Sequence, residues 1–305
     1  MNNSGNNIKK EETIFSIEKD GDLKSSDVSQ TYQSQILNQL NISTKIKTKY
    51  TGKGVKIAIL DSGIDISHED LSIKDEVSFL NTEDTSYSTG HGTHVAGIIG
   101  AKPTNNGSVE GIAPETDLFS IKILNERDVG KNSILISAID WCLDNKMDIV
   151  HTSISSQKRS KIVNYAVQKA YDKGILLISS AGNQGMYLKE SITFPGAYDS
   201  VIAVGSVDQN NKRSVFSSVG ESLELMAPGE NIYSTEPNNS YGQRDGTSMA
   251  APYITGIAAL IMEKNPKLTN KEVRKILNET ADEIGEPFLY GNGIVNAQKA
   301  LLQVK

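Results

Sequence analysis

The sequence predicts an α/β protein with three layers, in which a mostly parallel central sheet is flanked by helices on both faces. Three observations support this prediction. Short apolar runs such as VKIAIL at 55–60 have the length and composition of strands buried on both sides. Amphipathic stretches with apolar residues at helix spacing separate these runs. The stretch 248–264 is mostly apolar, as expected for a helix buried on all sides.

The predicted elements alternate along the chain after residue 31. Strands are predicted where short runs are rich in apolar residues, at 55–60, 148–154, 175–182 and 201–207. Helices are predicted where apolar residues recur at helix spacing or fill a long run, from Leu135, at 161–173 and at 248–264. One further helix is indicated by a capping box, in which Glu272 follows Thr269 at the required spacing.

The domain organisation is predicted to be simple. Residues 1–30 are polar and of mixed charge, apart from a short apolar cluster around Phe15, and are interpreted as a flexible N-terminal extension. A regulatory role for this extension is the alternative. No linker-like break follows, so residues 31–305 are predicted to form one domain.

Composition and charge limit the classes of partner. The 31 basic and 37 acidic residues give a net charge of −6, which disfavours nucleic acids and anionic membranes. The single cysteine, Cys142, excludes an internal disulfide. The N-terminus has no apolar signal-peptide core, and no run of 18 apolar residues occurs. A cytoplasmic protein is therefore predicted, and a secreted one only if a signal peptide has been removed; the oligomeric state is not predicted.

Four residues have the chemistry of acyl transfer. A serine hydroxyl becomes nucleophilic when a histidine takes its proton, a carboxylate orients that histidine, and preorganised donors hold the oxyanion. Asp61 ends an apolar strand, where α/β folds position functional groups. His91 lies in a glycine-flanked segment that opens a helix, Ser248 begins the apolar helix, and Asn183 follows a strand. Individually, each could be an ordinary turn or cap residue.

His94 offers a different interpretation of the same segment, because it lies three residues after His91 and could share a metal ion with it. The spacing of a zinc protease motif is absent, and a metal site needs a third ligand. We therefore expect His94 to be a packed, hydrogen-bonded histidine.

Taken together, these segments resemble one family, the subtilisin-like serine proteases, or subtilases. The resemblance rests on AILDSGID, GHGTHVAGIIG, SSAGNQG and GTSMAAP, which occur in that family's order and lie within a similarity covering roughly residues 31–305. It implies the subtilisin-like fold and a serine endopeptidase that forms an acyl-enzyme. Asp61 would orient His91, His91 would deprotonate Ser248, and Asn183 would donate to the oxyanion. No cofactor for catalysis is implied.

The resemblance also implies where an extended peptide or protein substrate binds. Ser153, Ile154 and Ser155 match the edge strand that pairs with the substrate. Ser180, Ala181 and Gly182 match a wall of the S1 pocket, and Gln184 lies near its rim. Family members usually carry glycine where this chain has Ser155. The added side chain predicts a narrower specificity than that of a degradative subtilisin.

A structural calcium ion is a further implication. Asp70 matches a calcium ligand of the family, and Asn105 and Asn106 lie in the loop that supplies others. Calcium needs six to eight oxygen ligands, and this loop offers amide and carbonyl oxygens without a carboxylate. The alternative is that Asp70 caps a turn.

The biological role has several candidates. A short N-terminal extension is found in intracellular subtilisins, where it covers the active site, and cytoplasmic lantibiotic leader peptidases lack a long prodomain; both are similar to this chain. A peptide-binding pseudo-protease would have lost one of the four catalytic residues, and none is lost. A lipase would require the motif G-x-S-x-G and a different residue order.

Overall fold

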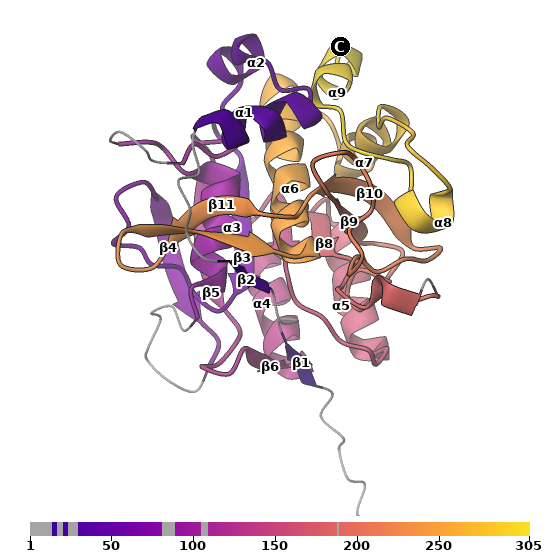
Figure 1. Cartoon of the computed structure of the whole chain (residues 1–305). Coiled ribbons are helices and arrows are strands. Elements are labelled where there is room, and N and C mark those ends of the chain that lie inside the picture. The colour runs from indigo at the N-terminus through magenta and orange to yellow at the C-terminus, as the bar shows by residue number, and fades with distance from the viewer. Residues whose placement is uncertain (1–13, 17–20, 24–29, 81–88, 105–108, 188) are drawn as a thin grey trace, which may run out of the picture.

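A seven-stranded parallel sheet forms the centre of the computed structural model, which describes residues 14–16, 21–23, 30–80, 89–104, 109–187 and 189–305 of the chain (Figure 1). All neighbouring strands of this sheet run parallel. Across the sheet the order is β10 (Leu223–Pro228), β9 (Ile202–Val207), β8 (Leu176–Ser180), β7 (Ile149–Thr152), β3 (Lys56–Asp61), β5 (Asp117–Lys122) and β4 (Ile73–Ser78). The predicted fold class is confirmed.

Helices cover both faces of the sheet, because successive side chains of a strand point to opposite faces. In β3, Ile57 and Ile59 pack in a core with α3 (His91–Gly100) and α6 (Thr247–Lys264). The alternate residues Ala58 and Leu60 pack in a second core with helices on the other face. Those helices are α4 (Asn132–Asp144) and α5 (Lys161–Asp172).

The remaining helices lie around this framework. They are α1 (Gln30–Gln39), α2 (Thr44–Lys49), α7 (Asn270–Glu279), α8 (Pro287–Tyr290), α9 (Ala297–Gln303) and the 3₁₀ turn η1 (Gly185–Tyr187). The capping box predicted at Thr269 and Glu272 is formed at the start of α7, with both reciprocal hydrogen bonds. Among the described helices, none combines the length and apolar character needed to span a membrane.

A β-hairpin crosses in front of α3 (Figure 1). Its strands are β11 (Ile232–Glu236) and β12 (Ser240–Asp245), and β12 leads directly into α6. Ser234 and Thr235 donate hydrogen bonds to the carbonyls of His94 and Thr93, each at 2.7 Å. The hairpin is therefore fixed to the first turns of α3.

Two short strands come from the N-terminal extension that the sequence predicted to be flexible. β1 (Ile14–Ser16) pairs antiparallel with β6 (Val129–Lys131), and β2 (Gly21–Leu23) pairs antiparallel with residues 243–245 of β12. Sequence patterns could not reveal this pairing, because the edges of β6 and β12 become available only in the folded chain.

Candidate functional site

Asp61 and His91 meet at the carboxyl end of the central sheet. Asp61 is the last residue of β3 and His91 the first of α3. The imidazole Nδ1 lies 2.9 Å from both carboxylate oxygens, and each residue is only 1% exposed. Asp61 also accepts from the Ser62 backbone N–H at 2.7 Å. An ionised Asp61 therefore holds the proton on Nδ1 and leaves Nε2 with the basic lone pair.

Glycine at position 92 permits this contact. A β-carbon there would lie 2.4 Å from the carbonyl oxygen of Gly63 and 3.2 Å from the Asp61 side chain. The first turn of α3 can consequently approach the end of β3 only without a side chain at this position.

Ser248 and Asn183 come together at the start of α6. Ser248 is the second residue of this helix, and the N-cap residue Gly246 makes no side-chain cap. The Asn183 oxygen Oδ1 accepts from the Thr247 backbone N–H at 3.0 Å and from its hydroxyl at 2.9 Å. The Thr247 hydroxyl oxygen accepts from the Gly182 N–H at 3.1 Å. Because a backbone N–H can bond only to the amide oxygen, this contact fixes the orientation of the Asn183 amide.

The predicted edge segment follows β7 directly. The Ser153 hydroxyl lies 3.3 Å from the carbonyl oxygen of Ser248. Ile154 is fully buried in the core, so only its backbone is available to a bound peptide. Ser155 is also largely buried. The strand ladder ends at Thr152, two residues before the predicted strand does.

The predicted pocket wall lies at the end of β8 and beyond it. Ser180, Ala181 and Gly182 are all buried, whereas Gln184 is exposed and its Oε1 accepts from the Gln157 amide at 3.2 Å. Their role as wall and rim of a substrate pocket stays a prediction.

Thr193 is a buried residue of this region that sequence reasoning missed. Its N–H donates to the Ala181 carbonyl at 2.9 Å, and the next residue, Phe194, pairs with Ser156 through two hydrogen bonds of 2.9 Å. Residues 193–194 thus connect the predicted wall to the predicted edge segment. The segment carries no chemical motif, so its position could be found only from the tertiary structure.

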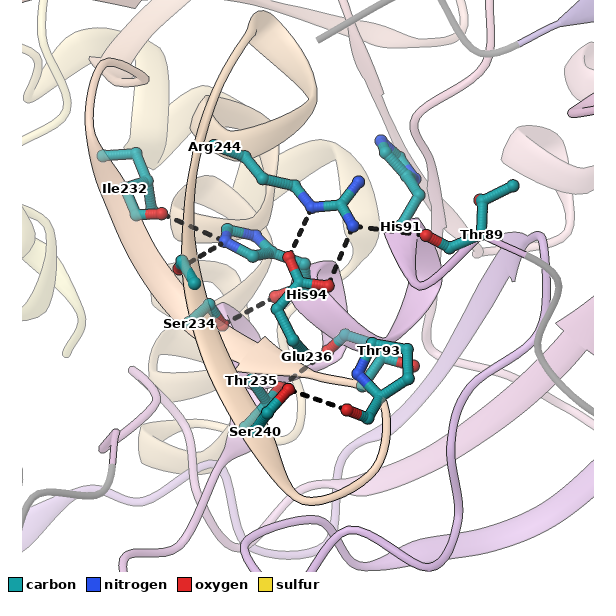
Figure 2. Close-up of polar contacts among 12 residues, drawn as sticks. Thr89, His91, Thr93, His94, Ile232, Ser234, Thr235, Glu236, Ser240 and Arg244 are labelled. Carbon is teal, nitrogen blue, oxygen red and sulfur yellow. Dashed lines mark hydrogen bonds and ion pairs between the residues drawn. The ribbon is translucent and has the colours of Figure 1, made fainter. Parts of the chain in front are cut away.

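The turn before His91 is held by an ion pair on the hairpin (Figure 2). Arg244 contacts Glu236 through Nε at 2.6 Å and through Nη2 at 2.8 Å. Nη2 also donates to the Thr89 carbonyl at 3.3 Å. The Thr89 hydroxyl donates to Asp128 at 2.9 Å, and burial raises the pKa of that carboxyl. Charged side chains from the β11–β12 hairpin and from the loop before β6 therefore contact the turn that precedes α3.

Two other histidines near the site are buried and neutral. Burial lowers the pKa of His94 well below its usual value, and its Nε2 donates to the Ile232 carbonyl at 3.0 Å (Figure 2). Burial also lowers the pKa of His151 to about 3. His94 is thus directed at backbone of the hairpin while His91 is directed at Asp61. Across the residues the structure describes, no cluster of three or more metal-binding side chains is found.

Asp70 accepts hydrogen bonds from protein donors. They are the Thr104 N–H at 3.0 Å, the Thr104 hydroxyl at 2.9 Å and the Tyr241 hydroxyl at 2.8 Å. Asn105 and Asn106 lie outside the described residues. The described residues alone therefore do not fit the six to eight oxygen ligands of calcium, and calcium binding stays a prediction.

Comparison with known proteins gives consistent matches. A sequence model of the subtilase family matches residues 52–293. Subtilisin DY from Bacillus licheniformis is 45% identical over 255 residues, which cover 82% of this chain and 92% of that protein. Subtilisin E from Bacillus subtilis (strain 168) is 43% identical, with coverage of 82% and 66%. A thermostable alkaline protease from Halalkalibacterium halodurans is 38% identical over 294 residues, with coverage of 96% and 79%.

Proposed function

Because the chain belongs to the subtilase family and is a serine endopeptidase, we propose that Asp61, His91 and Ser248 carry out its catalysis and that Asn183 donates to the oxyanion. The contact of 2.9 Å between the buried Asp61 carboxylate and His91 Nδ1 is the main support. It gives His91 the tautomer that a general base needs.

The reaction follows from these roles. His91 Nε2 takes the hydroxyl proton of Ser248, and the serine oxygen attacks the carbonyl carbon of the peptide bond. The Asn183 side-chain amide and the Ser248 backbone N–H donate to the oxyanion. His91 then returns the proton to the leaving amine, and the C–N bond breaks. Water hydrolyses the acyl-enzyme by the same steps, which restores Ser248.

The substrate is an extended peptide that adds as a strand beside residues 153–155. The side chain of the substrate residue just before the cleaved bond is directed between this segment and residues 180–182. Burial of Ser155 and Thr193 supports a restricted pocket and a specific processing role. Maturation of a lantibiotic leader is the more specific alternative; a cut at a single site in a precursor peptide would favour it.

The N-terminal segment is a second ligand candidate for the same site. β6 begins one residue after Asp128, and β12 carries Arg244; both residues contact Thr89, close to His91. The pairing of β1 with β6 and of β2 with β12, next to the residues that hold the turn before His91, supports an N-terminal segment that limits activity until it is cut.

Intact-mass measurements over time test this regulatory role. The wild-type chain should lose its N-terminal segment while its activity rises, and the Ser248→Ala chain should stay intact until active enzyme is added. Full activity of the uncut chain would contradict it.

Hydrolysis of a mixed peptide library by the wild-type chain and by Ser248→Ala tests the proposed function, with cut sites mapped by mass spectrometry. Cuts that the variant does not make are expected. Cuts at many unrelated sites would indicate a degradative enzyme, and cuts confined to one narrow sequence motif would indicate a processing enzyme. Peptide binding without any cut, before and after loss of the N-terminal segment, would instead support a peptide-binding pseudo-protease. Cytoplasmic location remains a separate proposal, to be tested by fractionating the producing cells.

A further inference from the structure

The carbonyl of Ser248 lacks its normal helix partner. In an α-helix the carbonyl of residue 248 accepts from the N–H of residue 252. Residue 252 is Pro252, which lies inside α6 and has no N–H. Since Ser248 is buried, its carbonyl oxygen needs another donor.

The Ser153 hydroxyl supplies that donor. It comes from the segment after β7 and lies 3.3 Å from the Ser248 oxygen. Ser153 is itself buried, and its oxygen is 2.9 Å from Nε2 of His151, which is fully buried in β7. The Nδ1 atom of His151 lies 2.8 Å from the hydroxyl of Thr255, which is about two turns along α6 from Ser248. A continuous chain of hydrogen bonds therefore joins His151 of β7 to α6 at two points, the Ser248 carbonyl and the Thr255 hydroxyl.

Two arrangements of protons are possible, and the need of the Ser248 carbonyl for a donor selects one of them. The Ser153 hydroxyl has a single proton, so it can donate either to Ser248 or to His151. If it donates to Ser248, then Nε2 of His151 must carry a proton and donate to Ser153. Nδ1 then accepts from the Thr255 hydroxyl, 2.8 Å away, so that hydroxyl no longer donates to the Ala251 carbonyl at 3.2 Å. The Ala251 carbonyl keeps the backbone N–H of residue 255 as its helix donor. The other tautomer would take the Ser153 proton away from the Ser248 carbonyl.

We infer that His151 is a positioning residue for catalysis, because its Nε2–H directs the Ser153 hydroxyl to the Ser248 carbonyl and so fixes the peptide group of the nucleophile. The low pKa of His151, about 3, keeps the imidazole neutral, as this arrangement requires. His151 is fully buried, and its ring contacts the hydroxyls of Ser153 and Thr255. Its effect reaches Ser248 through Ser153, and the inference rests on the proposed role of Ser248.

Nuclear magnetic resonance can identify the tautomer without turnover. In the Ser248→Ala chain, which keeps the backbone carbonyl, long-range ¹H–¹⁵N spectra of labelled histidine should show His151 protonated at Nε2 and unprotonated at Nδ1. Protonation at Nδ1, or at both nitrogens near neutral pH, would overturn the inference.

Kinetics test the positioning effect in the whole enzyme. Ser153→Ala and His151→Asn should each lower kcat about tenfold with little change in KM, the scale of one lost hydrogen bond. The kcat of the double variant should be no lower than that of the more impaired single variant, because both substitutions remove the same chain of contacts. His151→Gln, whose longer amide can reach Ser153, should recover much of kcat.

Two controls separate this effect from others. Titration of Ser248 with a fluorophosphonate counts correctly folded sites, so that kcat refers only to these. Unchanged kcat in Ser153→Ala, additive losses in the double variant, or a loss confined to KM would each overturn the inference. Activity that survived Ser248→Ala would instead defeat the proposed function, while the tautomer result would still stand.

Discussion

The amide of Asn183 is oriented by Thr247, whose backbone N–H and hydroxyl both donate to Oδ1, at 3.0 and 2.9 Å. Because the oxygen is held by the residue next to Ser248, the amide NH₂ group is directed away from Thr247. The same contact thus links the start of α6 to the loop after β8 and sets the direction of a proposed oxyanion donor.

Replacing Asn183 by leucine should lower kcat by about 10²–10³, the range known for loss of this type of donor in subtilisin itself, with little change in KM. Thr247→Val removes only the hydroxyl donor and keeps the N–H, so it should cost far less. Steady-state kinetics on one peptide substrate would measure both. Equal losses in the two variants would mean that Asn183 acts mainly by holding α6.

Arg244→Gln should destabilise the protein and loosen the turn that carries His91. The Arg244 and Glu236 side chains are only 17% and 18% exposed, so loss of one charge leaves the other poorly solvated. We expect a decrease of about 2 kcal/mol in the free energy of unfolding. The double variant with Glu236→Gln should lose less than the sum of the single losses. Urea unfolding in a Ser248→Ala background measures these free energies. Losses that simply add would show that Arg244 and Glu236 do not stabilise each other.

Low pH should destabilise the protein through its buried histidines. The pKa of His151 in the folded chain, about 3, lies below the value of 6.5 expected after unfolding, so the unfolded chain binds protons first as the pH falls. The stability that depends on a neutral His151 is fully present above pH 6.5 and is lost as the pH falls from that value to about 3. His151 should therefore lower the free energy of unfolding by about 1.4 kcal/mol per pH unit in this window.

Calorimetry of the Ser248→Ala chain between pH 7 and pH 5 measures this slope. The matched control adds His151→Gln, which removes one titrating group and should flatten the curve. An unchanged slope would show that His151 does not remain neutral in the folded protein.

Ser155→Gly should broaden the specificity of cleavage. Removing a largely buried side chain beside the proposed substrate path leaves more room for bulky residues. Relative kcat/KM values for peptides that differ at one position should shift by up to about 100-fold toward larger side chains. Identical relative rates in both enzymes would rule out Ser155 as a determinant of specificity.

Much of the fold could be predicted from local patterns. Apolar runs such as Lys56–Asp61 mark parallel strands because both faces of the sheet are covered, and the capping box at Thr269 marks a helix start without tertiary information. The contact between Asp61 and His91 follows from a strand end and a glycine-rich helix start that the sequence displays.

The features that could not be predicted depend on segments far apart in the chain. Thr193 acquires its place by pairing with Ala181, and β2 pairs with an edge more than 200 residues away. The chain from His151 to Ser248 depends on the packing of β7 against α6, and on Pro252, whose effect is visible only in a helix.

Covalent labelling tests the central claim most directly, because only a serine activated by its neighbours reacts rapidly with a fluorophosphonate. The wild-type chain should gain one adduct, which peptide mapping assigns to Ser248. His91→Ala should react far more slowly, and Ser248→Ala should not react. An adduct on another serine, or equal labelling of Ser248→Ala, would contradict the proposed catalytic site.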